Sequence, residues 1–132
     1  MTEEKPHILY VEDHEDSRFV TELMLRHAGL SVTSVDNGED CLKLARDRKF
    51  DLILMDQVMP GASGVELCSD IRAFDKETPI LFYSARASDD DKEAAIEAGA
   101  DGYLSKPDHL DYLTPRIWRM VSRRGITGSE DN

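Results

Sequence analysis

Acidic side chains stand directly after two short apolar runs of this chain. Asp56 follows the run 52–55, and the pair Glu12 and Asp13 follows the run 8–11. Each run is typical of a strand buried on both faces, where an unpaired carboxylate is costly. Because open α/β sheets bind ligands beyond the carboxyl ends of their strands, we interpret these acids as functional. The pattern predicts that all three share one acidic pocket.

A hydroxyl and an amine are predicted at the same edge. Ser84 follows the apolar run 79–83, and Lys106 follows the run 102–105. One lysine cannot balance three carboxylates, so we expect a cation among them. Oxygen ligands without His or Cys suit a hard ion such as Mg²⁺. A metal, a lysine and a hydroxyl around one carboxylate are the parts of a phosphoryl-transfer site, in which Asp56 can be the nucleophile.

The elements that must position these residues follow from the apolar pattern, which alternates between short runs and helical periodicity. Strands are expected at 7–12, 31–35, 51–55, 79–83 and 102–105. Helices are expected at 16–28, from the turn at 37–38 to about 48, from 63 through 71, at 88–98 and at 109–123. Five strand–helix pairs predict a parallel sheet with helices on both faces. The expected fold is a single-domain, flavodoxin-like (βα)5 three-layer sandwich with strand order 2-1-3-4-5. We expect the domain to span 6–123 and a polar, disordered tail to span 124–132.

Composition narrows the classes of partner and location. The net charge is −11 and the sequence pI is about 4.7, which argues against direct binding of nucleic acid or of an anionic membrane. No apolar run approaches the roughly 20 residues of a membrane helix, and the acidic N-terminus is unlike a signal peptide. Cys41 and Cys68 stand far apart in the sequence, which is typical of packed, reduced thiols. These features favour a cytoplasmic protein.

Five motifs in order, each at the end of an expected strand, carry a family resemblance. They are Glu12-Asp13, Asp56 with Met59-Pro60-Gly61, Ser84-Ala85, the stretch 99–104 and Lys106-Pro107. From about residue 6 to residue 123 the chain resembles the CheY-like receiver domain of the two-component response regulators. The resemblance implies bacterial-type signalling, in which a receiver is switched by phosphorylation and is not a conventional enzyme beyond its own phosphorylation and dephosphorylation.

The resemblance also implies roles for individual residues. Asp56 would accept a phosphoryl group from a histidine kinase or a phosphotransfer protein. Mg²⁺ would bind Asp13, Asp56 and the backbone carbonyl of Val58, with Glu12 acting through water. Lys106 and Ser84 would contact the phosphoryl oxygens. Receivers further imply that the Lys106–Pro107 bond is cis.

A switch and a partner surface complete these expectations. By the resemblance, Ser84 and Tyr103 would report phosphorylation on the face built from the fourth helix, the fifth strand and the last helix. Helical spacing gathers one aromatic and three basic residues on the outer side of the last helix, with Trp118 at the margin. They are Tyr112, Arg116, Arg119 and Arg123. This face could be a solvated surface, or a docking site for a downstream protein or a second copy in a homodimer.

Two other functions remain open at this point. A pseudo-receiver would bind a protein partner without phosphorylation, although the intact Asp13, Asp56 and Lys106 argue against it. A phosphatase of the haloacid dehalogenase type also uses an aspartate nucleophile at a strand end. It needs a second acid two residues further on, and that position is Val58 here.

Overall fold

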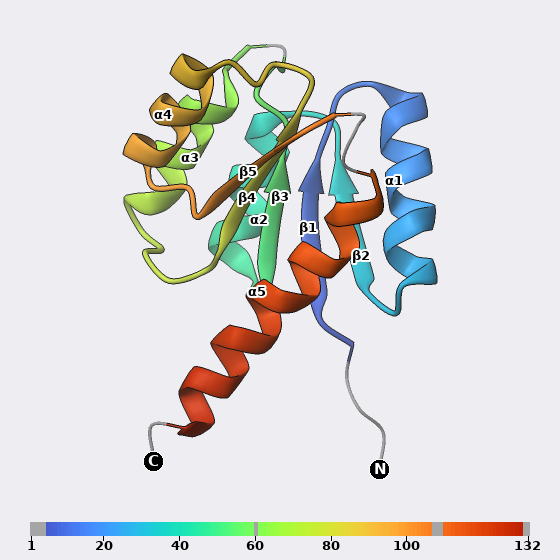
Figure 1. The fold of residues 1–132 in the computed structure, drawn as a ribbon. Coiled ribbons are helices and arrows are strands. Elements are labelled where there is room, and N and C mark those ends of the chain that lie inside the picture. The colour runs from blue at the N-terminus through green and yellow to red at the C-terminus, as the bar shows by residue number, and fades with distance from the viewer. Residues whose placement is uncertain (1–4, 60, 107–109, 131–132) are drawn as a thin grey trace.

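The computed structural model describes residues 5–59, 61–106 and 110–130. Within them, strands and helices alternate from the first strand to the last helix (Figure 1). Their bounds are β1 His7–Val11, α1 Glu15–His27, β2 Ser31–Val35, α2 Gly38–Asp47, β3 Leu52–Met55, α3 Gly64–Arg72, β4 Ile80–Ser84, α4 Asp89–Ala98, β5 Gly102–Ser105 and α5 Leu110–Glu130. None of the helices so described is both long and apolar enough to cross a membrane.

The five strands form one parallel sheet in the order β2-β1-β3-β4-β5. The predicted fold class and strand order are therefore confirmed, and β2 lies at an edge as its alternating sequence predicts. The register pairs Val11 with Met55, so Glu12 and Asp56 leave adjacent strands at the same level. It also pairs Ser84 with Ser105, which brings Lys106 to the same edge.

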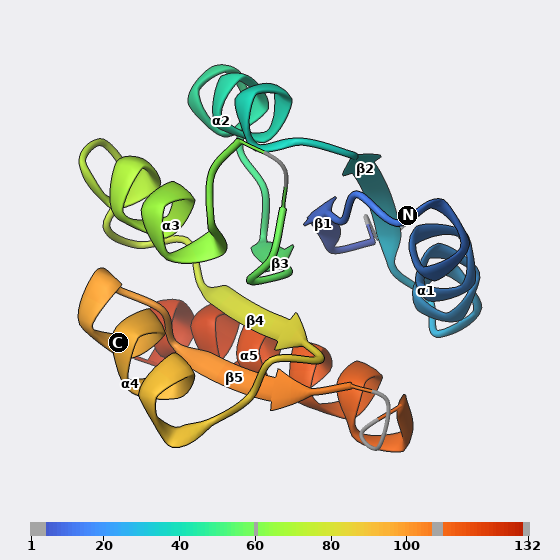
Figure 2. The ribbon, with the colours of Figure 1, turned by 90° about the horizontal axis from the view of Figure 1, so that it is seen from above.

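Helices cover both faces of the sheet. In Figure 2, α2, α3 and α4 lie on one side, and α1 and α5 lie on the other. Successive residues of β1 point to opposite faces, so Leu9 joins the core under α2 and α3 while Ile8 joins the core under α1 and α5. Cys41 and Cys68 are buried free thiols in the first of these cores, and burial raises the pKa of Cys41 to about 12. Helices thus cover both faces of the sheet and leave its carboxyl edge accessible to the loops.

The side of helix α1 that packs against the core is not the side that carries Phe19, Val20 and Leu23, as the apolar pattern would suggest. Thr21 and Leu25 are buried, whereas Phe19, Val20 and Leu23 are 60%, 54% and 52% exposed. The periodicity correctly predicts a helix, but an apolar stripe cannot show whether it meets the sheet or the solvent. An exposed apolar ridge therefore runs along α1, which begins just after Asp13.

The helix boundaries differ in how well the sequence predicts them. Capping boxes at Ser63 with Glu66 and at Ser88 with Asp91 start α3 and α4 where the spacing predicts. The last helix does not end at Arg123 but continues to Glu130, because a helix already nucleated by its packed first half extends at little cost per residue. The domain limits of 6–123 stay a prediction.

Candidate functional site

The three predicted carboxylates meet at the carboxyl edge of β1 and β3. One oxygen from each of Glu12, Asp13 and Asp56 lies within 4.8 Å of the others. Glu12 is 2% exposed and Asp56 is 9% exposed, while Asp13 is open to solvent. Two of the acids are thus buried at the base of the site, and Asp13 is exposed at its opening. A ligand that enters there can reach all three carboxylates.

Asp56 uses its two oxygens differently. Its Oδ1 accepts hydrogen bonds from the backbone N–H of Gln57, at 2.6 Å, and of Val58, at 3.4 Å. Its Oδ2 faces the ammonium group of Lys106, and the N–O distance is 3.4 Å. The backbone therefore fixes the plane of the carboxylate, and Oδ2 is the oxygen turned toward the only cation in the described part of the cluster.

Lys106 and Glu12 form the tightest ion pair of the site. The Nζ of Lys106 lies 2.5 Å from Oε1 of Glu12, and it also stands 5.3 Å from the centre of the Tyr83 ring. The second oxygen of Glu12 accepts the backbone N–H of His14 at 3.0 Å. Burial raises the pKa of Glu12, and the hydrogen bond from Lys106 opposes that rise. With both oxygens engaged, Glu12 is suited to reach an ion through water.

A glycine allows α3 to pack closely against the loop that follows β3. A Cβ atom on Gly64 would stand 2.4 Å from the backbone oxygen of Asp56 and 2.7 Å from the Phe82 ring. The N–H of Gly64 donates to the carbonyl of Gln57 at 2.8 Å. The start of α3 therefore buttresses the loop that carries Asp56.

Ser84 ends β4, and Tyr103 lies on the neighbouring strand β5. Ser84 is 1% exposed, and its hydroxyl accepts the N–H of Arg86 at 3.1 Å. The Tyr103 ring stacks on Phe82 with 5.3 Å between ring centres, and its hydroxyl donates to the carbonyl of Arg86. Burial raises the pKa of Tyr103, and hydrogen bonds from the Gln57 and Ser84 side chains lower it in part. Both residues of the predicted switch pair thus contact the same short loop.

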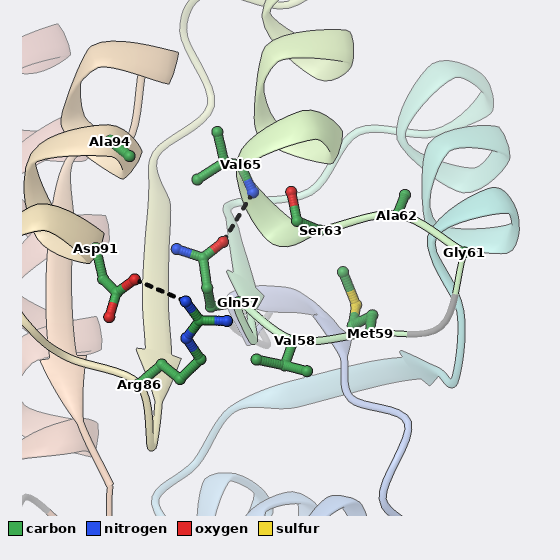
Figure 3. Close-up of a pocket in the computed structure, with 10 residues that line it drawn as sticks. All are labelled: Gln57, Val58, Met59, Gly61, Ala62, Ser63, Val65, Arg86, Asp91 and Ala94. Carbon is green, nitrogen blue, oxygen red and sulfur yellow. Dashed lines mark hydrogen bonds and ion pairs between the residues drawn. The ribbon is translucent and has the colours of Figure 1, made fainter.

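An open cavity of about 540 Å³ adjoins the acids on the side of α3 and α4. Figure 3 shows Arg86 and Asp91 paired at one side of it, near the Gln57 amide. The nitrogen–oxygen distance of this ion pair is 3.3 Å. Apart from Ser63, the other walls of the cavity are apolar and come from the β3–α3 loop and the two helices. They include Val58, Met59, Ala62, Val65 and Ala94. Val58, whose backbone carbonyl is the predicted Mg²⁺ ligand, is one of the residues that line this cavity.

The predicted partner face on α5 is only partly free. Tyr112 is 60% exposed and Arg119 is exposed, but Arg116 is half-buried and its guanidinium lies against Gly102. Trp118 points inward, where its indole N–H donates to the Ala28 carbonyl at 2.9 Å. The side chain of Arg123 and the residue Pro107, with the predicted cis bond, lie outside the described part of the chain.

Two polar groups of the site were not predicted from the sequence. The Gln57 side chain is 6% exposed and accepts the N–H of Val65 at 3.1 Å. The carbonyl of Arg86 receives the Tyr103 hydroxyl. A polar residue directly after a buried strand-end acid is a signal for Gln57. A backbone carbonyl leaves no such signal in the sequence.

The ligand set fits Mg²⁺ on chemical grounds. The atoms offered by Asp13 and Asp56 are carboxylate oxygens, and the neighbouring backbone can add a carbonyl at Val58. A small, hard ion prefers such oxygens with water completing its shell, and the open mouth at Asp13 leaves room for water. No His or Cys belongs to the cluster in the described residues, which disfavours a softer metal.

Comparisons with known proteins point to one family. The model of the response regulator receiver domain matches residues 8–117. The chain is 41% identical over 127 residues to the transcriptional regulatory protein AfsQ1 of Streptomyces coelicolor and 37% identical over 127 residues to PrrA of Mycobacterium tuberculosis. Each alignment covers 96% of this chain, but the chain spans only about half of these relatives, at 56% and 54%.

Solved structures agree with the fold. The receiver domain of the sensor histidine kinase PA1611 from Pseudomonas aeruginosa, which holds a magnesium ion in its active site cleft, matches with a TM-score of 0.83 and 33% identity. This match covers 90% of the present chain and 99% of the other. The receiver domain of the Francisella response regulator 1452 matches with a TM-score of 0.85 and 27% identity, over 91% and 99% of the two chains.

Proposed function

Because this chain belongs to the family of response regulator receiver domains, we propose that it accepts a phosphoryl group on Asp56 and converts it into a changed protein-binding surface. The donor is a histidine kinase or a phosphotransfer protein. The observation that carries this proposal is the convergence of Glu12, Asp13 and Asp56 within 4.8 Å, with Lys106 facing Oδ2 of Asp56 at 3.4 Å.

The transfer is a simple exchange of bonds at phosphorus. Oδ2 of Asp56 forms the new O–P bond while the P–N bond of the donor phosphohistidine breaks, and the leaving nitrogen keeps the electron pair. Lys106 neutralises charge on the phosphoryl oxygens, and Ser84 donates its hydroxyl to one of them. Asp13, Asp56 and the carbonyl of Val58 would hold Mg²⁺, which supplies further charge neutralisation. The backbone N–H groups on Oδ1 keep the carboxylate oriented throughout.

The test is phosphorylation with a small donor. With Mg²⁺ and acetyl phosphate, the wild-type chain should gain one acid-stable, base-labile phosphoryl group, and mass spectrometry of the borohydride-reduced protein should place it at residue 56. Asp56→Asn, which keeps the shape of the side chain, should not be labelled. Equal labelling of Asp56→Asn would overturn the assignment. Asp36→Asn, at an acid outside the cluster, is the matched control.

We place the output surface on α4, β5 and α5. Tyr103 is the link, because its hydroxyl contacts the β4–α4 loop and its backbone belongs to β5. Arg119 is the exposed cation of the predicted α5 face with a described side chain. Arg119→Glu should weaken self-association or partner binding of the phosphorylated chain in analytical ultracentrifugation. If association is the same with and without phosphorylation, and in the variant, this surface is only a solvated helix face.

The second candidate function is that of a pseudo-receiver, which binds a protein partner without being phosphorylated. It would leave Mg²⁺ binding and acetyl phosphate labelling undetectable in the wild type. The intact ion pair between Lys106 and Asp56 favours the phosphorylated receiver. Since the relatives are transcriptional regulators about twice as long, binding of nucleic acid by a longer protein is compatible with this proposal.

A further inference from the structure

The side chain of Asp13 is the least restrained of the three carboxylates in the site. Backbone N–H groups fix the carboxylate of Asp56. Lys106 and the N–H of His14 hold the two oxygens of Glu12. The carboxylate of Asp13 is exposed and accepts no hydrogen bond from the residues that the structure describes. Its direction therefore depends on the main chain that carries it.

Arg18 restrains that main chain from the first turn of α1. Its guanidinium nitrogen Nη1 donates to the backbone carbonyl of Glu12 at 3.0 Å. This carbonyl belongs to the same planar peptide unit as the N–H of Asp13, so a bond to one fixes the orientation of the other. In Figure 1 the loop after β1 leads directly into α1, so a side chain from the start of the helix can reach back to the end of the strand.

The backbone on either side of this peptide is also held. The N–H of Glu12 donates to the Val35 carbonyl at 3.1 Å, which continues the pairing of β1 with β2. The N–H of His14 donates to Oε2 of Glu12 at 3.0 Å. Asp13 therefore lies between two anchored residues. Of these contacts, the one from Arg18 comes from a side chain outside the acids, so a substitution can remove it and leave every carboxylate in place.

Arg18 contacts the main chain of the site and not its carboxylates. Within the described residues, its guanidinium forms no ion pair with Glu12, Asp13 or Asp56. A positive charge near the acids by itself disfavours the binding of a metal ion. The charge of Arg18 and its hydrogen bond to the peptide therefore act on metal affinity with opposite signs, and an experiment can tell which of them is larger.

We propose that Arg18 is a positioning residue, which clamps the Glu12–Asp13 peptide so that the Asp13 carboxylate is oriented for Mg²⁺ before the ion arrives. This inference rests on the proposed function, because the role of Asp13 as a Mg²⁺ ligand is part of it. A ligand held in its binding orientation loses less conformational freedom on binding, and the affinity is higher for that reason. Groups that orient metal ligands typically contribute about tenfold or more to metal affinity.

The experiment compares the wild type, Arg18→Met and Arg26→Met in their affinity for Mn²⁺, a paramagnetic stand-in for Mg²⁺. Free Mn²⁺ is measured by electron paramagnetic resonance, and competition with Mg²⁺ shows that both ions share one site. Arg26 is the matched control, because it lies in the last turn of α1 and donates to the Val32 carbonyl at 3.2 Å. Arg18→Met should weaken the affinity by about tenfold, and Arg26→Met should leave it unchanged.

Unchanged or stronger binding of Mn²⁺ by Arg18→Met would overturn the proposal, since loss of the positive charge alone strengthens the binding of a cation. Equal weakening in Arg26→Met would overturn it as well, because the effect would then be a general one of α1. Thermal melting in the presence of a chelator checks that each variant is folded. Arg18→Gln, which is too short to keep the bond, replaces the methionine variant if that variant does not fold.

A readout in the metal-free protein tests the clamp directly. The carbonyl ¹³C resonance of Glu12 responds to a hydrogen bond at its oxygen, so Arg18→Met should shift it and Arg26→Met should not. An unmoved resonance in Arg18→Met shows that the clamp is not formed, and the proposal then fails.

The variant Asp13→Ala separates this inference from the proposed function. If Asp13→Ala binds Mn²⁺ as tightly as the wild type, the metal site of the proposed function lies elsewhere, and the proposal for Arg18 fails with it even when the resonance moves. If Asp13→Ala loses the ion and Arg18→Met keeps its full affinity, only the proposal for Arg18 fails.

Discussion

Replacing Lys106 by methionine should show how strongly the stability of the site depends on the ammonium group of Lys106. The change keeps most of the apolar stem and removes the ammonium group, which stands 2.5 Å from Oε1 of Glu12 and 3.4 Å from Oδ2 of Asp56. Glu12 is 2% exposed, so its charge then keeps the backbone N–H of His14 but loses its ion-pair partner, and it meets little water. Removing one member of a buried ion pair costs about 3–5 kcal/mol when the other stays charged.

Protonation of Glu12 sets an upper limit to that cost. The ordinary pKa of a glutamate, about 4.3, lies about 2.7 units below pH 7. Protonating such a group at pH 7 costs about 1.36 kcal/mol for each of these units, or roughly 3.7 kcal/mol in total. In the variant, the pKa of folded Glu12 rises further above its unfolded value, because the bond from Lys106 that opposed the rise is gone. The folded state then binds more protons than the unfolded state between these two pKa values, so stability falls as pH rises through that window.

Urea unfolding at pH 5, 6 and 7, with a chelator present, checks this reasoning. We expect Lys106→Met to lose about 2–4 kcal/mol at pH 7, and the deficit to shrink by up to about 1.4 kcal/mol for each pH unit toward pH 5. The control is Lys106→Met with Glu12→Gln, which removes the buried charge and should recover most of the loss. A deficit that is the same at all three pH values, or that Glu12→Gln does not reduce, would refute the argument.

Three further predictions follow from particular contacts. Asp13→Ala should abolish the rise in melting temperature that Mg²⁺ gives the wild type by mass action, and an undiminished rise would place the metal elsewhere. Gly64→Ala should lower the free energy of unfolding by about 1–3 kcal/mol in urea, since its Cβ would stand 2.4 Å from the Asp56 carbonyl, and an unchanged midpoint would contradict that close approach. Phe19→Ser with Leu23→Ser should change stability by only about 0.5 kcal/mol and leave acetyl phosphate labelling intact, because both are exposed on α1. Because these exposed apolar side chains lie on the helix that begins just after Asp13, we expect a phosphodonor protein to dock on them. The same pair should then slow transfer from a phosphodonor protein by about tenfold, and equal transfer rates would contradict docking on α1.

Much of the fold follows from local features of the sequence. Short apolar runs define the strands because both faces of a central parallel strand are buried, as they are in Leu52–Met55. Capping boxes at Ser63 and Ser88 mark helix starts because side chains three residues apart can satisfy each other's backbone groups. Parallel strands place their carboxyl ends at one edge of the sheet. The order of strands and acids along the chain was therefore enough to predict that Glu12, Asp13 and Asp56 meet.

Other features depend on how separate elements face each other, and only the tertiary structure decides them. The apolar ridge of Phe19, Val20 and Leu23 points to solvent because Leu25 takes the place against the sheet, and helical periodicity is the same for both arrangements. Trp118 turns inward because the Ala28 carbonyl, distant in sequence, offers its indole a partner. The Tyr103 hydroxyl meets the carbonyl of Arg86, and no spacing along the chain encodes that contact. A sequence pattern thus determines elements and shared edges, while the choice of partners for individual side chains belongs to packing.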